Sequence, residues 1–66
     1  MSPDEYEFVQ NVLAAANENP RKLNNWEQGF AEDFAGRVEK YGMDAHCSAK
    51  QWGVISKIAE KLEVFR

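Results

Sequence analysis

The sequence predicts a small all-α domain, a three-helix bundle with helices over about residues 3–17, 25–41 and 49–64. In each of these stretches apolar residues recur every three or four positions, which places them on one face of an α-helix. A serine or asparagine precedes each stretch, with a glutamate or glutamine three residues later, as in a capping box. Turn-rich segments, NENPRKL and MDAHC, separate the three stretches.

The first helix is predicted to begin at Pro3, because a proline at the first helical position lacks only an N–H that has no helical partner there. Ser2 is placed as the N-cap, and Glu5 completes the capping box. Asn19 precedes Pro20, which disfavours the α conformation and ends the helix. The inward face is expected to consist of Tyr6, Val9, Val12, Leu13 and Ala16.

The central helix is the most aromatic part of the chain and carries one apolar stripe: Trp26, Phe30, Phe34, Val38 and Tyr41. Steps of four, four, four and three keep these side chains within about 120° of one another on a helix. Either Asn24 or Asn25 can cap it, with Glu27 or Gln28 as the matching capping-box residue. Gly42 is expected to end the helix in a left-handed conformation.

The third helix is predicted to start after Ser48, an N-cap that pairs with Gln51 in another capping box. Its inward face is expected to consist of Trp52, Ile55, Ile58, Ala59 and Leu62. Short connections favour either an antiparallel bundle or a helix-turn-helix-like arrangement of the last two helices.

Length and composition limit the kind of protein that this chain forms. Its 66 residues allow one domain, residues 1–66, and an apolar content of 44 % indicates a folded chain. No apolar run approaches the roughly 18 residues of a membrane span, and the acidic N-terminus lacks the features of a secretory signal. The single cysteine, Cys47, excludes an internal disulfide. We therefore expect a cytoplasmic protein with no membrane partner.

Residues 23–62 contain the pattern L-x-x-W-E-x-x-F, then R-x-x-x-Y-G, then S-x-K-Q-x-x-V-x-x-K-I-x-x-K-L. This pattern, which covers about 40 of the 66 residues, resembles a small helical module of short phage and prophage proteins. It is also similar to segments joined to some phage DNA-replication and recombination proteins. The resemblance implies a bacterial or phage origin and an accessory role, and it implies no catalytic residue.

Asp44, His46 and Cys47 form a cluster of possible metal ligands. A structural zinc site needs four ligands, usually in two separated pairs, whereas this cluster has one histidine next to one cysteine. A catalytic Cys–His pair is equally poorly supported, because adjacent side chains rarely align for proton transfer. We therefore expect no metal, no cofactor and no enzymatic activity.

Six residues are candidates for a protein interface: Phe8, Gly29, Gly36, Val54, Val64 and Phe65. Two glycines seven residues apart lie on one side of the central helix, where each costs up to about 1 kcal/mol relative to alanine. That cost indicates the close approach of another backbone, with packing inside the bundle favoured over a partner protein. The apolar pair at the chain end either belongs to an interface patch or folds back onto the first helix.

Five basic residues are candidates for nucleic-acid binding: Arg37, Lys40, Lys50, Lys57 and Lys61. The three lysines lie along one side of the third helix and can contact phosphates if that helix is a recognition helix. The net charge of −3 disfavours strong non-specific binding. The Gly42–Cys47 connection is also longer than the turn of a helix-turn-helix motif. A solvated lysine face is the simpler interpretation.

The functional hypothesis is a non-enzymatic, phage-like protein-interaction module, acting in the bacterial host cell as an adaptor or as an inhibitor of a host protein. Anti-CRISPR proteins are the most specific example of that class. The hypothesis predicts a protein complex or a homodimer that buries Phe8 and Phe65. The alternative is a helix-turn-helix-like nucleic-acid-binding accessory protein. The acidic residues Glu27, Glu32, Asp33 and Glu39 form either a nucleic-acid mimic or, more commonly, a solvated surface.

Overall fold

The computed structural model describes residues 1–65 and contains three α-helices in that range: α1 (Pro3–Glu18), α2 (Asn25–Tyr41) and α3 (Ala49–Leu62). Two short 3-10 helices, η1 (Pro20–Lys22) and η2 (Gly42–Asp44), lie in the connections. No strand occurs within the described residues. The predicted small all-α three-helix fold is confirmed.

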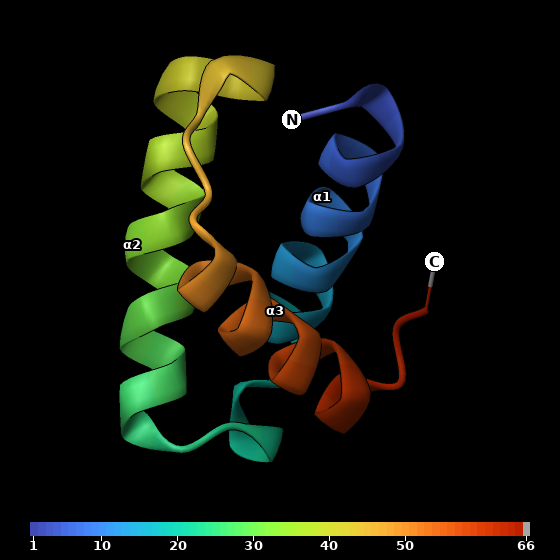
Figure 1. Ribbon diagram of the computed structural model, residues 1–66. Coiled ribbons are helices and arrows are strands. Elements are labelled where there is room, and N and C mark those ends of the chain that lie inside the picture. The colour runs from blue at the N-terminus through green and yellow to red at the C-terminus, as the bar shows by residue number, and fades with distance from the viewer. Residues whose placement is uncertain (66) are drawn as a thin grey trace.

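The helices form an antiparallel pair crossed by a third helix (Figure 1). α1 and α2 run in opposite directions, and α3 crosses in front of them obliquely. Its most extensive backbone contact is with α1. After α3 the chain turns back along α1, so the last described residues lie beside that helix. This arrangement leaves α2 in contact with α3 along one edge and with α1 along the other.

All three predicted capping boxes are present, and they explain where the helices begin. In each box the N-cap side chain accepts a hydrogen bond from a backbone N–H of the first turn, and the partner side chain accepts one from the N-cap N–H. The pairs are Ser2 with Glu5, Asn24 with Glu27, and Ser48 with Gln51. The structure thus selects Asn24 over Asn25 as the cap of α2.

The core combines residues from all three helices with Leu23 and Ala45 from the connections. Its buried members are Val9, Val12, Ala16, Leu23, Ala31, Phe34, Val38, Ala45, Ile55, Ile58, Ala59 and Leu62. The predicted inward faces of the first and third helices are therefore largely confirmed. Tyr6, Leu13 and Trp52 are half-buried at the core's edges.

The aromatic stripe of α2 is buried only in its middle. Phe34 and Val38 lie in the core, whereas Trp26 is 64 % exposed and Tyr41 is 52 % exposed. The buried face of α2 instead begins with Glu27, which lies about 100° around the helix from Trp26. Because α3 crosses obliquely, it covers Glu27 and leaves the indole beside it in solvent.

α3 ends at Leu62, two residues before the predicted end, because Glu63 adopts a left-handed conformation (φ 58°, ψ 39°). The N–H of Val64 donates to the carbonyl of Ala59, and the N–H of Glu63 donates to that of Glu60. These two bonds make a Schellman motif, which reverses the chain. The turn directs Val64 and Phe65 toward α1.

The connection between α2 and α3, which the sequence predicts to be a loop, contains the 3-10 turn η2. Gly42 has the expected positive φ (59°), but its ψ of −134° differs from that of a left-handed helical residue. That conformation starts the 3-10 turn of η2. The N-terminal ammonium group of Met1 donates to the carbonyl of Met43 at 2.7 Å, so the start of the chain is held against this turn.

Candidate protein-interaction surfaces

α2 carries a stack of aromatic rings that leads from the core to solvent. The rings of Trp26 and Phe30 lie 5.8 Å apart and 16° from parallel, and those of Phe30 and Phe34 lie 5.7 Å apart and 17° from parallel. Phe34 is buried and Phe30 is half-buried. The stack therefore holds the exposed indole of Trp26 against a rigid support.

A hollow of about 630 Å³ lies between the start of α2 and the middle of α3, next to Trp26. Its lining consists of Asn24, Trp26, Glu27, Val54, Lys57, Glu60 and Lys61. Val54, an interface candidate from the sequence, is half-buried here and packs against the core. The lining is apolar at Trp26 and Val54 and charged at the two glutamates and two lysines. We call this region the Trp26 surface.

Glu27 connects α2 to α3 at the floor of the Trp26 surface. Its Oε1 accepts a hydrogen bond from Lys61 Nζ at 2.6 Å and another from the backbone N–H of Asn24 at 3.0 Å. These bonds, the lysine's above all, hold the pKa of the Glu27 carboxyl below its ordinary value of 4.5 although burial opposes the shift. Glu27 therefore does not belong to a solvated acidic face.

The same contact changes the interpretation of the basic candidates. Lys61 is engaged by Glu27 across the α2–α3 contact, so its charge is already compensated. Lys40 lies over the ring of Tyr41, with Nζ 5.3 Å from the ring centroid. Arg37, Lys50 and Lys57 are exposed. Of these five basic residues, only Lys57 and Lys61 line the hollow beside Trp26. The connection between α2 and α3, residues 42–48, is longer than the turn of a helix-turn-helix motif.

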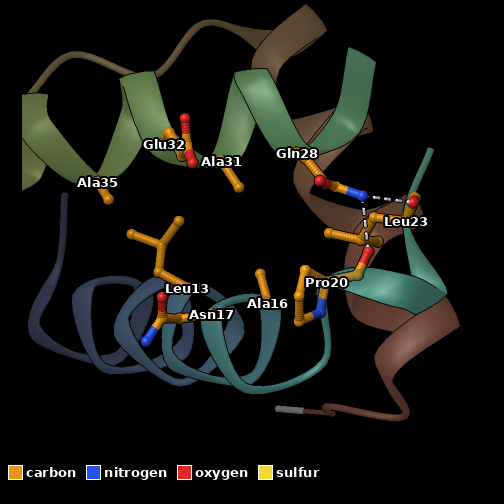
Figure 2. Close-up of a pocket in the computed structure, with 9 residues that line it drawn as sticks. All are labelled: Leu13, Ala16, Asn17, Pro20, Leu23, Gln28, Ala31, Glu32 and Ala35. Carbon is orange, nitrogen blue, oxygen red and sulfur yellow. Dashed lines mark hydrogen bonds between the residues drawn. The ribbon is translucent and has the colours of Figure 1, made fainter. Parts of the chain in front are cut away.

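A second surface, the α1–α2 groove, lies on the side of α2 that faces α1. A cleft of about 220 Å³ opens there between the two helices and is lined by Leu13, Ala16, Asn17, Pro20, Leu23, Gln28, Ala31, Glu32 and Ala35 (Figure 2). Gln28 closes the end of the cleft next to the η1 turn (at the right in Figure 2), where Nε2 donates to the carbonyls of Pro20 at 2.8 Å and Leu23 at 3.0 Å. Sequence reasoning missed this groove, although two alanines four residues apart in α2, Ala31 and Ala35, leave room for it.

The predicted close packing of two glycines inside the bundle is wrong. Gly29 and Gly36 are both exposed, and a Cβ added at either would have no neighbour within 4 Å. They lie on the outer side of α2, away from both α1 and α3. Their contact with a partner protein stays a prediction.

Residues 64 and 65 fold back onto α1, which is one of the two alternatives that the sequence leaves open. Phe65 is 74 % exposed and lines a hollow with Asp4, Glu7, Phe8 and Asn11 of α1. Phe8 and Val64 are half-buried and pack against the core. The structure thus brings Phe8 and Phe65 together and leaves most of one ring in solvent.

The polar loop before α3 does not favour nucleophilic chemistry. Cys47 is half-buried, and its burial, with the charge of Glu5 nearby, raises the pKa of the thiol above its ordinary value. A reactive cysteine requires a lowered pKa, so this thiol stays protonated at neutral pH. His46 and Asp44 are exposed. In residues 1–65 no three His, Cys, Asp or Glu side chains come together as a set of metal ligands.

Comparison with protein-family models, curated proteins and solved structures finds no match to this chain. Within residues 1–65 no helix is both long enough and apolar enough to cross a bilayer.

Proposed function

We propose that this protein is a non-enzymatic interaction module that binds a bacterial host protein through the Trp26 surface, as an adaptor or an inhibitor. The observation that carries the proposal is the exposure of Trp26, 64 % of whose surface lies in solvent beside the hollow. Tryptophan is the residue most enriched at the energetic centres of protein interfaces. Contiguous exposed apolar surface marks interaction sites, and the indole of Trp26 and the half-buried Val54 line the same hollow.

The support beneath Trp26 strengthens this proposal. Its ring is stacked on Phe30, which is itself stacked on the buried Phe34. A side chain held in one orientation loses little conformational freedom on binding, so more of its contact energy contributes to affinity. Three charged side chains also line the hollow: Lys57, Glu60 and Lys61. They supply the polar rim that protein interfaces usually have.

The cellular setting in this proposal rests on the resemblance of residues 23–62 to a phage and prophage module. An accessory protein of that kind acts in the cytoplasm of the bacterial host. Inhibition of a host defence protein, in the manner of anti-CRISPR proteins, is the most specific form of the proposal.

The test compares capture of proteins from a bacterial lysate by the tagged wild type, Trp26→Ala and Phe65→Ala. The second variant is the comparison, because it removes a comparably exposed aromatic ring at the other candidate interface, where Phe65 lies beside Phe8. We expect Trp26→Ala to weaken capture about thirtyfold, because truncating a residue at the energetic centre of an interface costs about 2 kcal/mol of binding free energy. We expect Phe65→Ala to leave capture unchanged.

Two results would contradict the proposal, provided that circular dichroism shows both variants folded. Equal capture by all three proteins would show that Trp26 is not the contact. A wild type that captures nothing and stays monomeric in light scattering would remove the function itself.

A second candidate is binding of single-stranded nucleic acid at the same hollow. The observation that favours it is the proximity of Trp26 to Lys57, since stacking and positive charge together bind single strands. Glu27 and Glu60 line the same hollow and oppose an anion there. Titration with a single-stranded oligonucleotide at low salt decides the matter, because this candidate requires binding that Lys57→Glu abolishes.

A further inference from the structure

The α1–α2 groove is longer than the cleft in Figure 2 alone. A second hollow of about 370 Å³ continues it toward the other end of the helices, and the two share Leu13 and Ala35 in their linings. Together they extend along α1 from Tyr6 to the turn at Pro20. At 1.5 Å per residue this is a groove about 20 Å long, which accommodates three to four turns of an α-helix.

The floor of the groove is apolar and made largely of small residues on the α2 side. Leu13 and Ala16 of α1 point toward Ala31 and Ala35 of α2 across the open space (Figure 2). Alanines let the backbone of another helix come close, and the space between the two helices receives the larger side chains of that helix. This shape is the one that helix-in-groove recognition requires.

The charge at the rim selects the partner. Glu32 and Glu39 line the two halves of the groove, are both exposed, and stand seven residues apart on the same side of α2. The lining of both hollows, as far as the described residues show, contains no lysine or arginine. A docked helix therefore meets an apolar floor with negative charge along one edge.

We propose that the α1–α2 groove docks a basic amphipathic helix of a partner protein. Its apolar face lies on Leu13, Ala31 and Ala35, and lysines or arginines spaced by seven residues face Glu32 and Glu39. A second copy of this chain does not supply such a helix, because the apolar face of its lysine-bearing helix, α3, is buried in its own core. The groove and the Trp26 surface lie on opposite sides of α2, so the two surfaces suit an adaptor that holds two partners.

The experiment uses a synthetic amphipathic peptide of about 18 residues, long enough to be helical, with leucines on one face and lysines at seven-residue spacing beside it. A peptide with glutamates in place of the lysines is its control. Binding to the full chain is measured by isothermal titration calorimetry, and the contact is mapped by amide chemical shifts. We expect only the lysine peptide to bind, with the largest shifts at Leu13, Ala31 and Ala35.

Paired variants separate groove recognition from general charge attraction. E32K/E39K reverses the charge at the rim, and D33K/E63K makes the same change in net charge at exposed carboxylates that line neither the groove nor the Trp26 surface. Ala35→Phe fills the floor, and Gly36→Phe adds the same ring on the solvent side. We expect E32K/E39K and Ala35→Phe each to weaken binding about tenfold or more and both controls to change it little.

Three results would overturn the proposal. Equal weakening by E32K/E39K and D33K/E63K would mean non-specific attraction, and no binding of the lysine peptide would mean that the groove is no such site. A concentration-dependent dimer in light scattering that Ala35→Phe abolishes would assign the groove to a second copy. Trp26→Ala leaves peptide binding unchanged in this proposal, so its outcome is separate from that of the proposed function.

Discussion

Glu27 combines two tasks in one side chain. The same oxygen that completes the capping box of α2 also receives Lys61 from α3, thirty-four residues along the chain. The residue is 6 % exposed, which is unusual for a glutamate and acceptable only because both bonds compensate its lost hydration. A local helix-start signal has thus become part of the contact between two helices.

We expect Glu27 to make the stability of the protein depend on pH. Because the folded state lowers its pKa below the ordinary value of 4.5, the carboxylate stabilises the fold above about that pH and ceases to do so as the pH falls through the lowered pKa. Glu27→Gln keeps the acceptor for Asn24 but loses the charged bond to Lys61, and should cost about 1–2 kcal/mol at pH 7.

Urea denaturation at neutral and acidic pH measures this effect. The difference between wild type and Glu27→Gln should shrink toward zero once Glu27 is protonated. Glu39→Gln, at an exposed position of the same helix, is the control and should stay within about 0.5 kcal/mol of wild type. A Glu27→Gln deficit that is the same at both pH values would show that the ion pair contributes nothing.

At the scale of the element, α2 is a helix weakened by its own glycines. Gly29 and Gly36 stand in its interior with open space where a side chain would be. The structure therefore offers no packing reason for them. Gly42 differs, because its positive φ and its ψ of −134° lie in a region that side chains rarely adopt.

Alanine substitutions should separate these two roles of glycine. Gly29→Ala and Gly36→Ala should each raise the free energy of unfolding by about 0.5–1 kcal/mol, whereas Gly42→Ala should lower it by about 1–2 kcal/mol. Thermal and urea unfolding measure all three. If Gly29→Ala lowers the stability, α2 has a close neighbour after all. If Gly29→Ala or Gly36→Ala is more stable than the wild type but captures less partner protein, that glycine belongs to the interface.

At the scale of the whole molecule, the core is small and shared by all three helices. Ile55, Ile58, Val9 and Val12 are its largest fully buried side chains. A domain of this size with no disulfide has a total stability of only about 3–5 kcal/mol. A single core substitution can therefore remove most of it.

We expect Ile58→Ala to unfold most of the protein at room temperature, because the substitution costs about 2–5 kcal/mol. Val54→Ala, at a half-buried position of the same helix, is the control and should cost about 1 kcal/mol. Far-UV circular dichroism and urea titration measure both. An Ile58→Ala variant with wild-type helicity and stability would mean that the core, as described, does not hold the fold.

The sequence by itself determined where the helices lie. The helix starts are marked by three N-cap residues: Ser2, Asn24 and Ser48. Each forms its capping hydrogen bonds with a residue three positions later, so the helix start can be predicted without knowing the tertiary structure. The buried faces of α1 and α3 also followed from periodicity, because in both helices the face that the neighbours cover coincides with the apolar stripe. The end of α3 was less predictable, since a glutamate rather than a glycine adopts the left-handed turn there.

Only the tertiary structure decided which side of α2 is covered. Its aromatic stripe spans about 120°, as do the stripes of α1 and α3. The covered face of α2 is rotated from that stripe, because the oblique crossing of α3 buries Glu27 and leaves Trp26 exposed. The Lys61 contact and the α1–α2 groove depend on residues far apart in the chain. Capping and turn residues act over one helical turn, whereas the Lys61 contact and the groove arise from how whole helices pack. Both proposed binding surfaces depend on that packing.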